Sequence, residues 1–244
     1  MTSPKAAALR ALHVPGDPLV LPNVWDAVSA RAVQEAGFAV VATGSAAIAR
    51  VLGYEDGEAA PVAEMLAAVA RIARVVDVPV TADVERGYGL KASELVERLL
   101  ATGAVGCNLE DSDPRTGRMV DPDEQAAYLA EVRAAAAGDL VINARVDTFV
   151  YGPRTQEDAV ARAHRYLAAG ADCVYPILAP DPAPLAAAID GPMNVIYLPD
   201  SPPLSELAAM GVARVSFGHG LHAAAHTYAV DLFTRVREGR NPYQ

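Results

Sequence analysis

Apolar runs rich in β-branched residues alternate with longer Ala-rich segments along the whole chain. The runs have the length of buried strands, and the Ala-rich segments carry apolar residues at helical spacing, so the pattern predicts alternating strands and helices. Strands are expected at residues 19–21, 38–42, 79–82, 105–109, 140–144, 172–175, 194–197 and 213–217. Helices are expected at residues 24–36, 61–76, 92–101, 123–137, 155–168, 182–189, 203–210 and 220–238.

These eight strand–helix units predict an α/β fold, a (β/α)8 TIM barrel, because consecutive βα units build a parallel sheet and eight of them close it. A length of 244 residues suits one such barrel. Five predicted helices are followed by the residue that most easily adopts left-handed backbone: Gly37, Gly103, Gly138, Gly170 and Gly211. No linker divides the chain, so residues 1–244 are predicted to form a single barrel domain, with residues 220–244 as its terminal helix and tail.

Composition and charge exclude several classes of protein. Hydrophobic residues make up 52% of the chain, which excludes wholesale disorder. The formal net charge of −10 provides no surface for nucleic acid or an anionic membrane, and no apolar run has membrane-spanning length. The N-terminus lacks the apolar core of a signal peptide, and the two cysteines, Cys107 and Cys173, have no metal-ligand spacing. We therefore expect a cytoplasmic protein whose partner is a small molecule.

Charged residues follow three neighbouring predicted strands directly. Asp83 and Glu85 follow the third strand, Glu110 follows the fourth and Arg145 the fifth. Barrel enzymes place catalytic groups at these carboxyl ends, so the four side chains are expected to meet at the mouth of the barrel. Clustered carboxylates raise one another's pKa unless a cation intervenes, and their oxygens suit Mg²⁺ or Mn²⁺. We predict a metal site at the three acids; salt bridges with nearby arginines are the alternative.

Further candidates lie in other loops at the same end of the predicted barrel. After the second strand, Thr43, Gly44 and Ser45 form a turn of small residues whose N–H groups can bind a carboxylate or a phosphate. The next loop carries Asp56, which can reach the cavity, although an acidic solvated turn explains it equally well. His219 follows the last strand, where it can serve as a general acid or as a substrate donor.

Several ordered motifs resemble the isocitrate lyase/phosphoenolpyruvate mutase superfamily. They read LPNVWDAVSARAVQEAGF, TGSAAIARVLGYEDGE, VPVTADVERGYG, AVGCNLEDS and INARVDTF, and PMNVIYLPDSPPLSELAAMGVARVSFG resembles the last two units of short bacterial members. The resemblance implies a Mg²⁺-dependent barrel that acts on small 2-oxo acids or enolpyruvyl compounds. It makes Asp83, Glu85 and Glu110 the metal-site acids, with Asp56 near the metal.

The resemblance also implies a set of residues for a small anionic substrate. Its carboxylate would bind at the turn 43–45, with Trp25 nearby, while Arg145 would hold the other anionic end and Asn194 would add a polar contact. The loop 111–122 departs from the family, because it contains neither the Cys of the isocitrate-cleaving lyases nor the Lys and Asn of the phosphonomutases. We therefore expect a lyase or decarboxylase for an oxaloacetate-like 2-oxo acid, with Arg115 or Arg118 closing on its distal carboxylate.

Three alternatives to this activity remain open. Phosphonomutase or phosphonopyruvate hydrolase chemistry would break a C–P bond, and a barrel with a decayed site would only bind ligand. Residues 216–220, which are rich in glycine, leave a phosphorylated substrate possible. A Schiff-base aldolase is disfavoured because neither Lys5 nor Lys91 follows a strand. In the family, the terminal helix is often exchanged between subunits, so a homodimer or homotetramer is expected.

Overall fold

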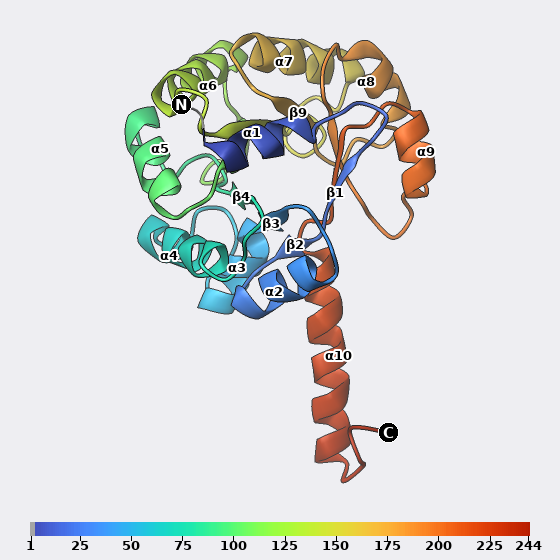
Figure 1. The fold of residues 1–244 in the computed structure, drawn as a ribbon. Helices are drawn as coiled ribbons and strands as arrows, with labels where there is room; N and C mark the ends of the chain where they lie inside the picture. Colours follow the sequence, from blue (N-terminus) through green and yellow to red (C-terminus); the bar gives the residue numbers. More distant parts are fainter. Residues whose placement is uncertain (1–2) are drawn as a thin grey trace.

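A computed structural model describes residues 3–244, and its strands form a closed parallel barrel at the centre of the fold (Figure 1). The barrel strands are β1 (Leu19–Leu21), β2 (Asn23–Val24), β3 (Val41–Thr43), β4 (Val80–Asp83), β5 (Gly106–Glu110), β8 (Val141–Val146), β9 (Cys173–Pro176), β10 (Asn194–Ile196) and β11 (Arg214–Ser216). Pro22 divides the first barrel strand into β1, which pairs with β11, and β2, which pairs with β3. A parallel bridge between Val174 and Met193 closes the ring between β9 and β10. The predicted TIM barrel is confirmed.

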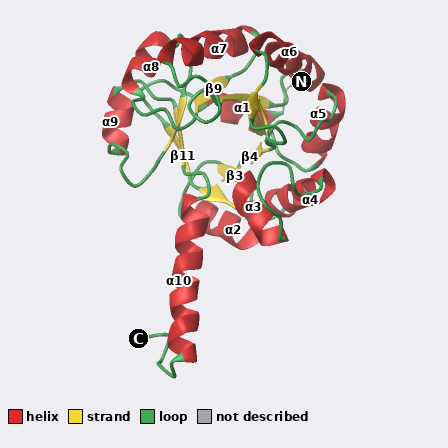
Figure 2. Ribbon diagram, turned by 180° about the vertical axis from the view of Figure 1, so that it is seen from behind, coloured by secondary structure: helices red, strands yellow, loops and turns green. Residues whose placement is uncertain are grey.

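Helices surround this barrel, as both views of the ribbon show (Figures 1 and 2). They are α1 (Pro4–Ala11), α2 (Ala27–Glu35), α3 (Ser45–Leu52), α4 (Val62–Ala73), α5 (Ala92–Ala101), α6 (Pro122–Ala136), α7 (Gln156–Ala168), α8 (Ala183–Ala188), α9 (Leu204–Ala209) and α10 (Gly220–Arg237). The last helix, α10, projects away from the barrel (Figures 1 and 2). None of the helices within residues 3–244 has both the length and the apolar character needed to cross a membrane.

The N-terminal end of the barrel is closed by α1. Its Leu9 is buried in a small apolar cluster with Leu21 from β1 and Val141 from β8. Close packing continues to Gly106, where an added Cβ would lie 2.7 Å from Leu9 Cδ2 and 2.9 Å from Thr81 Oγ1. Side chains therefore fill this end of the barrel, and the cavity described below lies toward the carboxyl ends of the strands.

Local sequence explains most element boundaries. The predicted helix 24–36 begins at Ala27 instead, because Asp26 and Ser29 form a capping box in which Asp26 Oδ1 accepts from Ser29 N at 2.7 Å. The five predicted helix-terminating glycines all have left-handed backbone, with φ between 89° and 102°. Two helices, α1 and α3, were not predicted: α1 precedes the first strand, and α3 lies in the loop after β3, ahead of α4, which is the helix that the alternation assigns to this βα unit.

The loop 111–122 contains a short hairpin that the sequence analysis did not predict. Its strands β6 (Ser112–Asp113) and β7 (Arg118–Met119) pair antiparallel, and Gly117 between them has a φ of 63°. A hairpin of this kind depends on pairing across the turn, which the polar sequence does not reveal.

Candidate active site

A cavity of about 230 Å³ opens at the carboxyl ends of the barrel strands. Six of the residues predicted from the sequence line it: Gly44, Ser45, Asp56, Asp83, Arg145 and His219. Asn23, Asn108 and Tyr175 also line it and were not predicted, and Ser216 belongs to the glycine-rich segment 216–220 that was considered for a phosphate. Parallel strands point their carboxyl ends to one side, and this is why residues far apart in the chain converge here.

Asp83 is held on one side of the cavity by the turn after β3. Its Oδ2 accepts from the backbone N of Ser45 at 3.1 Å and from Ser45 Oγ at 2.8 Å. The backbone N of Asp83 donates to Thr43 Oγ1 at 3.0 Å, and Thr43 itself is buried beneath the cavity. Burial and the charge of Asp83 both raise the pKa of Asp56, so two carboxylates compete for one small space.

Glu85 and Glu110, the other two predicted metal-site acids, are engaged with protein groups. Glu85 has left-handed backbone (φ 51°), and its carboxylate accepts from Tyr88 Oη at 2.6 Å and from Glu58 N at 2.5 Å. Burial raises the pKa of Glu85 to about 7. Glu110 is buried and pairs with Arg145. Among residues 3–244, no three acidic, His or Cys side chains are grouped as direct metal ligands.

Arg145 lies between two buried carboxylates. Its Nε contacts Asp147 Oδ1 at 2.6 Å, and its Nη2 contacts Asp147 Oδ2 at 3.2 Å and Glu110 Oε2 at 2.6 Å. Burial by itself would lower the pKa of Arg145, but the charges of Glu110 and Asp147 raise it by more than burial lowers it. The pKa therefore lies above its ordinary value. The guanidinium therefore stays charged, and its Nη1 is the nitrogen left for a ligand.

Asp147 is in turn fixed by a buried network. Its backbone N donates to Asp111 Oδ1 at 2.8 Å, and Ser112 Oγ donates to its carboxylate. The second oxygen of Asp111 accepts from Arg162 at 3.0 Å and from Tyr166 at 2.7 Å. Because every member of this network has a partner, the guanidinium of Arg145 is held in one orientation.

The amide of Asn108 is oriented by two donors. Its Oδ1 accepts from Asn143 Nδ2 at 2.9 Å and from Arg214 Nη2 at 3.1 Å. An arginine has no acceptor, so the amide oxygen must face Arg214 and the NH₂ group is left for the cavity. Arg214 is itself buried at 1% exposure, and its Nη1 lies 3.5 Å from His13 Nε2. The sequence analysis did not identify Asn108 as a donor. Arg214, an arginine inside a predicted strand, was a signal that a buried polar partner lies nearby.

The remaining predicted substrate-binding residues lie outside the cavity lining. Trp25 packs edge-on against His222, with 5.0 Å between ring centroids, and Asn194 is buried, donating to Ser216 Oγ at 3.1 Å. Arg115 lines a neighbouring groove together with Glu124, and Arg118 is exposed on β7. Asn194 therefore contacts the site through Ser216, while Arg115 and Arg118 lie outside it. The roles of all four residues stay predictions.

Comparison with known proteins shows the family to which the chain belongs. The family model for phosphoenolpyruvate phosphomutase matches residues 9–237. The chain belongs to this family. A structure from Burkholderia cenocepacia J2315, named as a proposed phosphonomutase, is 42% identical with a TM-score of 0.90, covering 95% of this chain and 100% of that one.

Relatives in the superfamily carry different activities in their names. An oxaloacetate decarboxylase of Bradyrhizobium is 32% identical over 91% of this chain and 81% of its own length. Phosphonopyruvate hydrolase, solved with oxalate and Mg²⁺, is 25% identical with a TM-score of 0.85, covering 98% of this chain and 89% of that one. The predicted membership of the isocitrate lyase/phosphoenolpyruvate mutase superfamily, whose named members are lyases, mutases and hydrolases, is confirmed.

Proposed function

We propose that this phosphomutase-family chain is a Mg²⁺-dependent lyase that decarboxylates a small, oxaloacetate-like 2-oxo acid. The observation that carries the proposal is a single cavity in which Asp83 and Asp56 face the donors Arg145 and Asn108. Such a cavity combines a site for a cation with donors for the anionic groups of a 2-oxo acid. The relative named as an oxaloacetate decarboxylase supports this choice of reaction.

The residues present fit a hard divalent cation. Burial and the charge of Asp83 both raise the pKa of Asp56, and a cation held by the two carboxylates would offset both effects. Mg²⁺ is commonly bound through one or two carboxylates together with water and substrate, which matches two acids in the cavity with Glu85 and Glu110 behind them. When bound, Mg²⁺ or Mn²⁺ would polarise the 2-oxo group and stabilise negative charge on its oxygen.

The chain's own residues would orient the substrate and move one proton. Arg145 and Asn108 donate to its carboxylate and carbonyl oxygens. Loss of CO₂ breaks the C–C bond and leaves the electron pair on an enolate. His219, which lines the cavity, would then return a proton to carbon. Because CO₂ leaves as a neutral molecule, this reaction does not need the acid catalyst that the loop 111–122 lacks.

Pyruvate release from oxaloacetate tests this proposal. We expect activity with Mg²⁺ or Mn²⁺, its loss in EDTA and a large loss in Asp83→Asn. Asp190→Asn, which removes an exposed acid away from the cavity, is the matched control and should keep full activity. Full activity after verified metal removal would refute the metal-dependent chemistry.

Cleavage of a C–P bond is the second candidate, because phosphonopyruvate hydrolase shares this fold and the family model is that of a phosphomutase. Phosphate release from phosphonopyruvate, measured beside pyruvate release from oxaloacetate, distinguishes the two reactions. Binding of oxalate and Mg²⁺ with no turnover of any substrate would instead favour a barrel that only binds ligand.

We also propose that α10 is covered by a second copy of the chain. The helix stands away from the barrel (Figure 2). Its side chains Tyr228, Val230, Phe233 and Val236 are exposed, with Phe233 at 70% exposure. Several large apolar side chains exposed together on one helix are typical of an interface. Light scattering at micromolar concentration should give two or four chains, and Phe233→Glu should lower the mass; a monomeric wild type would refute the proposal.

A further inference from the structure

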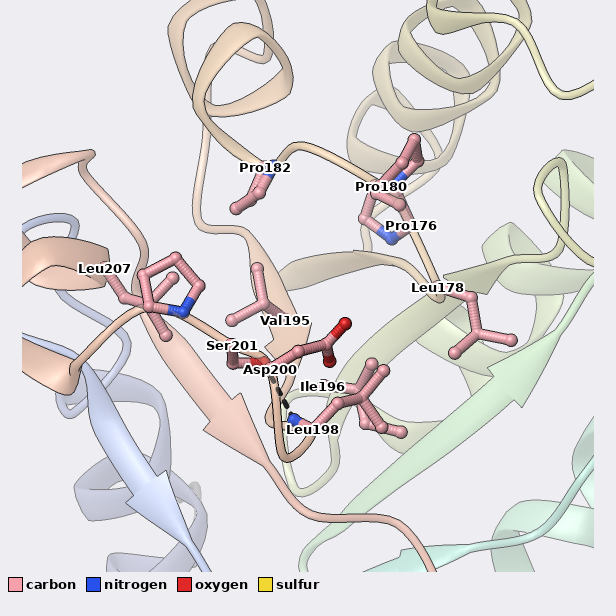
Figure 3. Close-up of a pocket in the computed structure, with 12 residues that line it drawn as sticks. Pro176, Leu178, Pro180, Pro182, Val195, Ile196, Leu198, Asp200, Ser201 and Leu207 are labelled. Atoms are coloured by element: carbon pink, nitrogen blue, oxygen red, sulfur yellow. Dashed lines mark hydrogen bonds between the residues drawn. The ribbon is translucent and has the colours of Figure 1, made fainter.

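A second cavity, of about 180 Å³, lies between the β9–α8 and β10–α9 loops. Figure 3 shows Pro182, Val195 and Leu207 around its inner part. Val195 and Leu207 are buried, while Ala179 in the β9–α8 loop is partly exposed and also lines it. We call this cavity the side pocket.

The side pocket adjoins the active-site cavity. Leu178, Ile196 and Leu198 line both spaces, so these three side chains form the boundary between them. Leu178 is 45% exposed and Leu198 is 36% exposed, and Leu178 has left-handed backbone (φ 57°). A ligand anchored at Asp83 and Arg145 can therefore extend over apolar side chains into the side pocket.

The walls of the side pocket select against a charged group. Four of its residues are prolines, Pro176, Pro180, Pro182 and Pro202, which have no N–H to donate. The N–H of Leu198 already donates to Ser201 Oγ at 2.8 Å. No Lys or Arg lines the described walls, and the charge there is the carboxylate of Asp200, which would repel an anion. The occupant that fits these walls is an uncharged apolar chain.

The size of the side pocket limits the length of that chain. A water molecule occupies about 30 Å³ of liquid, so the pocket corresponds to roughly six water-sized volumes. Allowing for contact with the walls, roughly three to five carbon atoms fit.

We propose that the side pocket binds an alkyl chain on C3 of the substrate, so that the preferred substrate is a 3-alkyl 2-oxo diacid rather than oxaloacetate itself. This inference rests on the proposed decarboxylase function. Loss of CO₂ from such a diacid leaves a linear 2-oxo acid whose chain extends from C3. These product-like acids need no turnover to bind, so they probe the side pocket separately from catalysis.

Calorimetric binding of pyruvate, 2-oxobutyrate, 2-oxopentanoate and 2-oxohexanoate, with Mg²⁺ present, tests the side pocket. In the wild type, affinity should rise about fourfold per added methylene, as expected for burial of apolar surface. Ala179→Leu fills the side pocket and should remove this dependence while leaving pyruvate binding unchanged. Ala179→Ser, the matched control, changes the same residue without filling the space and should retain the dependence.

Each outcome separates the side pocket from the proposed function. Equal affinities along the series in the wild type, no binding of any of these acids, or an unchanged dependence in Ala179→Leu would overturn the inference. Decarboxylation of oxaloacetate without chain-length dependence would keep the proposed function and remove the side pocket's role. Chain-length dependence that Ala179→Leu abolishes, without turnover of any 2-oxo diacid, would support the side pocket and refute the decarboxylase.

Discussion

Replacing Asp147 with Asn tests whether the buried network holds the substrate-binding arginine. Both carboxylate oxygens of Asp147 contact Arg145, at 2.6 Å and 3.2 Å, and the residue is completely buried. Asn keeps the shape but loses the charge. Its NH₂ group must face Arg145 in either orientation, against Nε at the Oδ1 position or against Nη2 and the Ser112 hydroxyl at the Oδ2 position. One charge-assisted bond is therefore lost and a donor is placed against a donor.

The magnitude follows from these contacts. A hydrogen bond to a charged group contributes about 1.5–3 kcal/mol, and breaking a buried ion pair costs about 3–5 kcal/mol. Because Glu110 still pairs with Arg145 at 2.6 Å, we expect the lower end for Asp147→Asn, about 2–3 kcal/mol of unfolding free energy. For a chain of this size, that loss lowers Tm by about 4–12 °C.

Activity should fall as well, because Arg145 loses the partner that orients it. Loss of an orienting residue typically costs about 10–100-fold, so kcat/KM should decrease by this factor. Thermal unfolding and pyruvate release measure the two effects, and Asp190→Asn controls for the removal of an acid elsewhere. A variant with wild-type Tm and wild-type kcat/KM would show that Asp147 does not support Arg145.

Three further predictions follow from buried polar groups. Burial, assisted by the charge of Arg214, lowers the pKa of His13 to about 4, so below pH 6.5 the unfolded chain binds a proton there more readily than the folded chain. The free energy of unfolding should therefore decrease by up to about 3 kcal/mol between pH 6.5 and 4. Denaturant unfolding at pH 7 and at pH 5 measures this decrease, which should be smaller in His13→Gln than in the wild type. Equal decreases in the two proteins would contradict the assignment to His13. Asn108→Asp keeps an acceptor for Arg214 but removes the donor in the cavity. Tm should therefore be maintained, while KM for an anionic 2-oxo acid should rise at least tenfold. An unchanged KM would exclude Asn108 as a substrate donor. Arg145→Lys cannot reach Glu110 and Asp147 with one planar fork, so kcat/KM should fall about 100-fold, and an unchanged value would place the anion site elsewhere.

The sequence by itself determined the barrel and the end at which its site lies. The alternation of strands and helices, and the glycines that end five helices, are local signals carried by neighbouring residues. Once the strands are parallel, residues at their carboxyl ends must lie together, so the predicted Asp83, Arg145 and His219 line one cavity. Family membership followed from the same ordered motifs.

Only the tertiary structure decided which way the polar side chains point and what they bind. Glu85 lies only two residues after Asp83, the last residue of β4, yet its backbone φ of 51° turns the carboxylate toward Tyr88. Arg145 is fixed by Glu110 and Asp147, although nothing in the sequence distinguished these contacts from open ligand positions. These orientations depend on contacts between residues distant in the chain, because a buried polar group must find its partner wherever the fold places one. The periodicity of a sequence records burial, and it carries no information about such pairings.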